Sequence, residues 1–218
     1  MTYRTILITA IALSLPAGAA LAQEAAMAPS ENVVVYGTLP GSTMPLSTAK
    51  VPGMLQSLDA ARIGARHGDT VLDTLGSEVA GVSLNDVQGN SMFQDLRFRG
   101  FQASPLQGTP QGLAVYQNGV RLNEAFGDTV NWDAIPDIAI DRMDVWSANP
   151  VFGLNALGGA VSLTMKNGFD THGGHASLQG GSFSHGMAAA EYGYTDGDFS
   201  FYGAGEAITD GGWRLHSG

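Results

Sequence analysis

Cysteine is absent from this 218-residue sequence, and charged residues make up only 14% of it. Without cysteine, neither a disulfide framework nor a thiolate metal site can form. The formal net charge is −10, and the 10 Lys and Arg residues form no cluster. Because phosphate binding depends on clustered basic side chains, the composition argues against nucleic acid as a partner.

The sequence also lacks long apolar runs. The apolar stretch nearest the N-terminus indicates how the protein is targeted. Arg4 is followed by a stretch from Ile6 to Leu15, which is shorter than the about 20 residues that a spanning helix needs. Ala20-Leu21-Ala22 then fits the small-x-small rule of signal peptidase. We therefore predict a signal peptide at residues 1–22, export, and cleavage before Gln23.

Glycine is abundant, at 30 residues, which favours turns and strands over a helical bundle. Residues 23–53 are predicted to be a flexible segment, because Gly, Pro, Ser and Thr dominate residues 38–53. This segment contains one compact β-forming stretch, Glu31-Asn32-Val33-Val34-Val35-Tyr36. Such an extended stretch can add as a strand to the sheet edge of a partner, or it can be the first strand of the domain that follows.

Residues 54–167 are predicted to form one α+β domain. Asp59 is a plausible N-cap for one or two helical turns through Ile63, and Asp69 for a clearer helix that stops near Gly81. Strands are predicted on either side of Asn118-Gly119, a dipeptide suited to a type I′ hairpin. Further strands are expected at 82–84, 95–99, 140–146 and 160–165, and a short helical turn at 150–157.

Residues 168–218 differ in character from the domain before them. Three Gly-rich stretches with alternating polarity are expected to be strands, at 176–180, 188–194 and 199–207. One face of the second would carry only Ala and Tyr side chains. Both transmembrane barrel strands and a soluble β-meander use this period of two, so the pattern alone leaves both open.

Six segments of the predicted mature sequence resemble, in the same order, segments of the TonB-dependent outer-membrane receptors. They are Glu31–Gly37 (the energy-coupling box), Asp69–Val82 (the first plug helix and the turn after it), Leu96–Phe101 (an Ile-Arg-Gly-Phe strand), Val115–Arg121 (the hairpin), Ile135–Val145 (the Ile-Pro and Ile-Glu-Arg-Ile-Glu-Val segment) and Phe152–Leu163 (the closing Tyr-Gly and Gly-Gly segment). Ala80, Asn118 and the run from Ser147 to Pro150 depart from the family pattern, which indicates a divergent subfamily.

The resemblance implies a fold and a place in the cell. The fold is an α+β plug domain with a small mixed sheet, followed by the first strands of an incomplete antiparallel transmembrane β-barrel. A complete barrel would need several hundred residues, whereas 50 follow Gly168 (218 − 168). The expectation is therefore that the chain is a fragment or a truncated gene product of a protein of the outer membrane.

The resemblance also implies a function: energised uptake of a scarce nutrient, here expected to be an iron chelate, with cobalamin and carbohydrate as other substrates of the family. The periplasmic domain of TonB would bind the Glu31–Tyr36 stretch, and lipid would surround the completed barrel. The substrate would meet the loops 102–112 and 123–132. Four side chains in or beside them are the candidates for contact: Phe101, Phe126, Asn131 and Trp132. The aromatic residues among them are equally suited to packing against a barrel wall.

Two other classes of protein fit the sequence to different degrees. No catalytic motif of a hydrolase, P-loop protein or metalloprotease is present, so we expect no enzyme and no cofactor. His172 and His175 are spaced like metal ligands but have no third ligand near them in sequence, so no metal site is predicted. The alternative that stays open is a soluble periplasmic or secreted binding module with a plug-like domain.

Overall fold

The structure is a computed structural model, which describes residues 36–37, 46–47, 53–66, 70–87, 90–147 and 150–211. The predicted signal peptide at 1–22, most of the predicted flexible segment, and Glu31 to Val35 of the coupling stretch lie outside the described residues. Within that segment, Tyr36–Gly37 (β1) pairs antiparallel with Leu46–Ser47 (β2). All described residues fall within one compact unit, Val34–Gly218.

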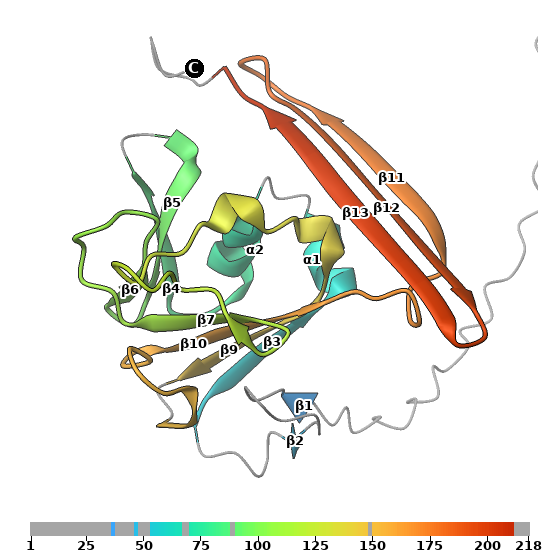
Figure 1. Ribbon diagram of the computed structural model, residues 1–218. Helices are drawn as coiled ribbons and strands as arrows, with labels where there is room; N and C mark the ends of the chain where they lie inside the picture. The colour runs from blue at the N-terminus through green and yellow to red at the C-terminus, as the bar shows by residue number, and fades with distance from the viewer. Residues whose placement is uncertain are drawn as a thin grey trace, which may run out of the picture. The chain divides into compact units, whose positions relative to one another are not determined.

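A five-stranded mixed sheet forms the centre of the plug-like domain (Figure 1). Its order is β3-β9-β10-β7-β8, and the strands are β3 (Leu55–Asp59), β9 (Ile140–Ser147), β10 (Gly159–Met165), β7 (Leu113–Gln117) and β8 (Val120–Arg121). β10 and β7 are parallel, and every other neighbouring pair is antiparallel. The mixed sheet expected from sequence is confirmed.

The predicted hairpin joins β7 to β8. Asn118 and Gly119 both have positive φ, 48° and 81°, as a type I′ turn requires. The turn brings Gln117 opposite Val120. Asn118 also accepts a hydrogen bond from the backbone of Met165 through its side-chain oxygen (2.9 Å), which fixes the turn against the end of β10.

Two short helices and a second, three-stranded antiparallel sheet complete the plug-like domain. The helices are α1 (Ala60–Arg66) and α2 (Val71–Glu78), and the strands are β4 (Val82–Val87), β5 (Asn90–Phe98) and β6 (Phe101–Ala103), in the order β4-β5-β6. Asp59 caps α1 as predicted, accepting from the backbone of Arg62 (2.8 Å), although the helix runs past Ile63. Neither helix in the described part of the chain is long and apolar enough to cross a membrane.

The predicted cap of α2 at Asp69 is wrong. Thr70 is the N-cap, and it forms a capping box with Asp73: the Thr70 hydroxyl accepts from the Asp73 backbone while the Asp73 carboxylate accepts from the Thr70 backbone. A capping box needs a side chain that accepts a hydrogen bond three positions after the cap. Asp73 meets this requirement for Thr70 and not for Asp69, so Thr70 is the N-cap. The helix also ends at Glu78 rather than near Gly81.

Both faces of the five-stranded sheet are buried. One face packs against α1, α2 and β5, and its core includes Ile63, Leu75, Phe98, Val115 and Leu163. The other face carries a smaller cluster in which Tyr116 and Trp146 contact Phe152. Phe152 belongs to η4 (Pro150–Phe152), a 3-10 turn shorter than the helical turn expected over 150–157. Two further 3-10 turns, η2 (Trp132–Ala134) and η3 (Asp137–Ala139), precede β9.

The last three strands form a separate antiparallel sheet: β11 (Gly173–Gly180), β12 (Gly186–Asp196) and β13 (Phe199–Thr209). The register pairs Ala190 with Ala176 and Tyr194 with Phe201, so Ala188, Ala190, Tyr192 and Tyr194 share one face, as predicted. That face is exposed and apolar. The opposite face carries Glu191, Glu206 and Tyr202, which are shielded from solvent to a greater extent.

Candidate functional site

An open pocket of about 700 Å³ lies among three loops of the domain: 104–112 before β7, 122–131 after β8, and 151–158 before β10. β7 and β10 are parallel neighbours, so the loops that lead into them meet at one end of the sheet. The first two loops are those from which a ligand contact is expected on sequence. The third, with Leu154 and Asn155, was not anticipated.

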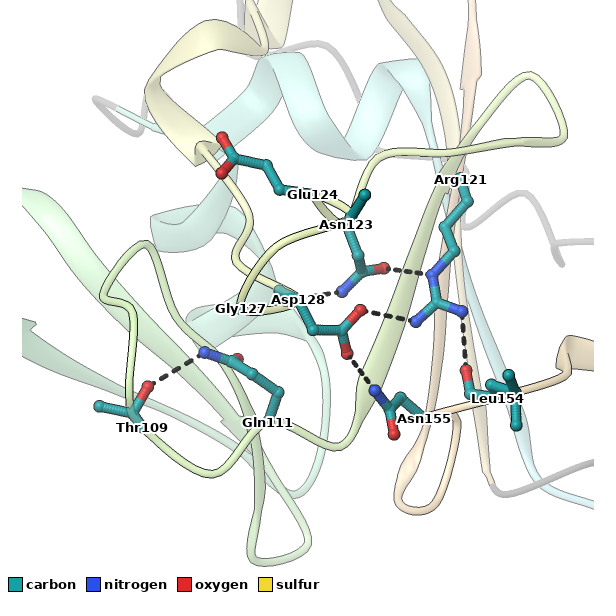
Figure 2. A pocket seen from close by; sticks show the side chains of 10 residues that line it. Thr109, Gln111, Arg121, Asn123, Glu124, Gly127, Asp128, Leu154 and Asn155 are labelled. Carbon is teal, nitrogen blue, oxygen red and sulfur yellow. Dashed lines mark hydrogen bonds and ion pairs between the residues drawn. The ribbon is translucent and has the colours of Figure 1, made fainter.

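Arg121, the last residue of β8, is the centre of the hydrogen-bond network in this pocket (Figure 2). Its Nη2 donates to Asp128 Oδ1 (2.8 Å), its Nη1 to the backbone oxygen of Leu154 (2.7 Å), and its Nε to Asn123 Oδ1 (3.3 Å). Asn155 completes the network by donating from Nδ2 to Asp128 Oδ2 (2.8 Å). One guanidinium thus connects two of the three loops to a strand of the sheet.

Asn123 fixes the start of the second loop from within the sheet. Its side chain is buried, and its Oδ1 accepts from the backbone of Val115 (2.7 Å). Its Nδ2 donates to the backbone oxygens of Leu113 (3.1 Å) and Asp128 (3.2 Å). The loop itself turns through Gly127 and Asp128, whose φ values are 81° and 56°. Glycine and aspartate are among the few residues that adopt this left-handed backbone readily.

The first loop is anchored by Ser104, which is fully buried. Its hydroxyl donates to the buried carboxylate of Asp95 in β5 and accepts from the backbone of Leu106 (3.0 Å). Its backbone N–H donates to Gln111 Oε1 (2.9 Å), and its backbone oxygen accepts from Val130 in the second loop (3.0 Å). Ser104 therefore ties both loops to each other and to the core.

Glu124 lines the pocket and is the exposed carboxylate there. Its Oε2 accepts from Thr129 Oγ1 (2.9 Å) and its Oε1 from Asn131 Nδ2 (2.8 Å). Figure 2 shows its carboxylate pointing away from Arg121. Asn131, one of the predicted contact residues, thus orients Glu124.

Phe101 and Trp132, also predicted to contact ligand, take part in packing. The Trp132 side chain is 4% exposed and belongs to the main core, and its Nε1 donates to the backbone oxygen of Ala103 (3.2 Å). Phe101 lies over Gly112 and Gly158, so closely that an added Cβ would come within 2.6 Å and 2.4 Å of its side chain. The side chain of Phe101 is still 37% exposed.

Phe126, the fourth predicted residue, is 76% exposed at the tip of the second loop. Three exposed aliphatic side chains, Val151, Leu154 and Leu157, belong to the third loop. Phe126 and Asn131 are therefore the accessible predicted residues in the second loop, while Trp132 is covered. Contact of any of the four with a ligand stays a prediction.

The polar side chains that line the pocket can bind a ligand through hydrogen bonds. Within the described ranges, no three His, Cys, Asp or Glu side chains are grouped so as to hold a metal ion. Sequence reasoning missed Arg121, Glu124, Asp128 and Asn155 as site residues. One signal was available: Arg121, Glu124, Asp128 and Asp133 are the charged residues between Phe101 and Ala134.

The chain resembles known proteins in sequence and in fold. The family model described as TonB-dependent Receptor Plug Domain matches residues 47–160. The chain is similar to the Rhizobactin receptor of Rhizobium meliloti (strain 1021), at 32% identity over 126 residues, which are 56% of this chain and 15% of that protein. The chain thus spans a small part of the length of the curated relative it matches.

Solved structures show the same fold at low sequence identity. The ferric preacinetobactin receptor BauA of Acinetobacter baumannii has a TM-score of 0.56 and 16% identity, over 75% of this chain and 24% of that one. The ferric-catecholate import receptor Fiu of E. coli K12 has a TM-score of 0.53 and 18% identity, over 78% and 23%. The ferric yersiniabactin uptake receptor FyuA of Yersinia pestis has 0.51 and 16%, over 72% and 24%.

Proposed function

The chain belongs to the TonB-dependent receptor plug domain family, and from this premise we propose that it carries the plug of an outer-membrane receptor for the energised uptake of an iron chelate of the siderophore type. The observation that carries the proposal is the pocket among the loops 104–112, 122–131 and 151–158, to which each loop contributes polar side chains and which is built on a plug fold. The similar proteins support the substrate class, since their names describe receptors for rhizobactin, ferric yersiniabactin and ferric preacinetobactin.

The tail sheet supports a membrane location. Leu178, Tyr192, Tyr194, Phe199 and Phe201 are between 47% and 86% exposed and lie on one face of β11–β13. A contiguous apolar face with aromatic residues gathered toward one end is what a lipid-facing strand surface requires. The polar face carries Glu191, which pairs with Lys166 of the plug-like domain. Lipid would contact the apolar face of this sheet, and the plug would contact the polar face.

We propose that the periplasmic domain of TonB drives uptake by binding the stretch Glu31-Asn32-Val33-Val34-Val35-Tyr36. Of these residues only Tyr36 is described, in β1. The β-branched run Val33 to Val35 favours an extended backbone that can pair with a sheet edge. Residues 1–22 would be removed as a signal peptide during export.

Growth under iron limitation tests the function. The reading frame that contains this chain is deleted in the bacterium that encodes it, and growth is measured with ferric siderophores from that bacterium's spent medium as the iron source. We expect growth to fail and to return on complementation. Growth of the deletion strain at the wild-type rate on every iron chelate would contradict the proposal, as would recovery of the protein from the soluble periplasmic fraction.

Substitution at Val34 tests the coupling segment separately. Val34→Pro removes one backbone donor from the predicted strand, whereas Val34→Ala keeps it. We expect Val34→Pro to abolish uptake while ligand binding stays intact, and Val34→Ala to retain uptake. If Val34→Pro cells take up the chelate normally, the segment is not the coupling element.

A further inference from the structure

The charged residues around the pocket are mostly acidic, which favours a ligand that is not anionic. Residues 101–134 and 150–158, which contain all three loops, include one cation, Arg121, and three carboxylates, Glu124, Asp128 and Asp133. Arg121, Glu124 and Asp128 line the pocket, so the formal charge of its lining is −1 (1 − 2). Loops 104–112 and 151–158 contain no charged residue and no histidine.

The single cation is already neutralised. Arg121 pairs with Asp128 at 2.8 Å, and each of its three nitrogens donates to an oxygen of the protein. Two of its five N–H groups (5 − 3) are left for a ligand, but the adjacent Asp128 carboxylate offsets its charge and so weakens its attraction for an anion. Glu124, by contrast, has no basic partner among the residues that the structure describes: the side chains that bond its carboxylate are the hydroxyl of Thr129 and the amide of Asn131.

Much of the donor capacity of the pocket is already used by the protein. Asn123, Gln111 and Asn131 each have their amide nitrogen engaged by an oxygen of the protein. An ionised carboxylate offers about four lone-pair sites, so Glu124 can accept further bonds. Asn155 donates from Nδ2 to Asp128, and its amide oxygen has no protein partner among the described residues. A ligand that carries N–H or O–H donors would match the oxygens of Glu124 and Asn155.

We propose, on the basis of the uptake function above, that this pocket takes a neutral or cationic ferric chelate that carries N–H or O–H donors, such as a ferric trihydroxamate, and discriminates against a tris-catecholate. Three hydroxamates neutralise a ferric ion, whereas three catecholates leave three net negative charges on the complex. Like charges brought together in a partly dehydrated site repel each other strongly. Glu124 is the residue that sets this preference, because its charge has no basic partner in the pocket.

A charge reversal in the full-length receptor tests the proposal. Binding of two probes is measured by tryptophan fluorescence: the neutral ferric trihydroxamate ferrichrome and the trianionic ferric complex of enterobactin. Glu124→Lys reverses the charge and Glu124→Gln removes it. Asp198→Lys, in the exposed turn between β12 and β13, makes the same charge change at a distance from the pocket.

We expect the wild-type receptor to favour the trihydroxamate, and Glu124→Lys to shift the ratio of the two affinities toward the tris-catecholate by about tenfold or more at low salt. Glu124→Gln should shift it by less, and Asp198→Lys should leave it within about twofold, as expected for a screened distant charge. A wild-type preference for the tris-catecholate, or equal shifts for Glu124→Lys and Asp198→Lys, would overturn the proposal while leaving uptake of iron chelates standing. Absence of binding by either complex, together with normal growth of the deletion strain, would refute the uptake function itself.

Discussion

Arg121 and Asp128 form an ion pair, 2.8 Å between Nη2 and Oδ1, that closes the loop after β8 onto the strand it leaves. The two side chains are 29% and 19% exposed, so the pair is partly shielded from water. Asp128 also holds a left-handed backbone with φ of 56°. The pair therefore fixes a loop conformation that costs free energy on its own.

Substitutions of Asp128 should separate the carboxylate from the backbone requirement. Asp128→Ala removes the ion pair. It also places alanine, which has no polar side chain to bond the backbone locally, in the left-handed region, so we expect a loss of about 2–3 kcal/mol in the free energy of unfolding. Asp128→Asn keeps a residue that tolerates that region, and it should lose about 1 kcal/mol. Urea unfolding of the chain measures both; equal losses would show that the backbone conformation contributes nothing.

Ser104 should be among the most sensitive polar residues of the domain. Ser104→Ala leaves the buried carboxylate of Asp95 without its hydroxyl donor and the backbone N–H of Leu106 without its acceptor, which should cost about 2–3 kcal/mol. Ser83→Ala, in an exposed position of β4, is the matched control and should change stability by less than about 0.5 kcal/mol. Similar small losses for both variants in urea titrations would refute the anchoring role.

The contact between Phe101 and Gly158 predicts a rescue. Gly158→Ala would place a Cβ 2.4 Å from the Phe101 side chain and should destabilise the chain by about 1–3 kcal/mol. Phe101→Gly removes the whole side chain, including the Phe101 Cβ that would itself lie 2.4 Å away, so the double variant should be more stable than the sum of the two single losses predicts. Gly205→Ala has open space at its Cβ and serves as the control. Additive losses in thermal unfolding would show that the two residues do not interact.

Lys166 and Glu191 join the end of β10 to β12, at 2.8 Å, and Tyr202 donates its hydroxyl to the same carboxylate (2.8 Å). Lys166→Met should therefore loosen β11–β13 from the plug-like domain. We expect faster hydrogen exchange across β12, with the amides of β7 and β10 unchanged. Lys50→Met, which lies outside the described residues, removes the same charge elsewhere and should leave the exchange of β12 as it is; a wild-type exchange pattern in Lys166→Met would refute the role of the pair.

The sequence was informative where the determinants are local. The hairpin at Asn118-Gly119 needs only two residues of positive φ, and the tail strands need only a period of two, so both were predicted correctly. The cap of α2 was predicted one residue too early, although Thr70 followed by Asp73 three positions later is a capping-box pattern that the sequence displays.

The candidate site was predicted less well because it depends on contacts between residues far apart in sequence. Parallel pairing of β7 with β10 brings the loop that contains Leu154 beside Arg121, 33 residues earlier, and no local pattern reveals that pairing. Burial of Trp132 has the same origin, since its N–H bonds Ala103 across 29 residues. Aromatic residues in a predicted loop gave no indication of which one the core would cover.

Uptake of radioactive iron supplied as a ferric siderophore is the most direct test of the central claim, which is energised import by a receptor with this plug. The deletion strain is complemented with the full-length reading frame, and accumulation is followed with and without a protonophore that collapses the energy supply to TonB. We predict that complementation restores accumulation, that the protonophore abolishes it, and that cell-surface binding survives the protonophore. Accumulation that is the same in the deletion strain, or unaffected by the protonophore, would contradict the account.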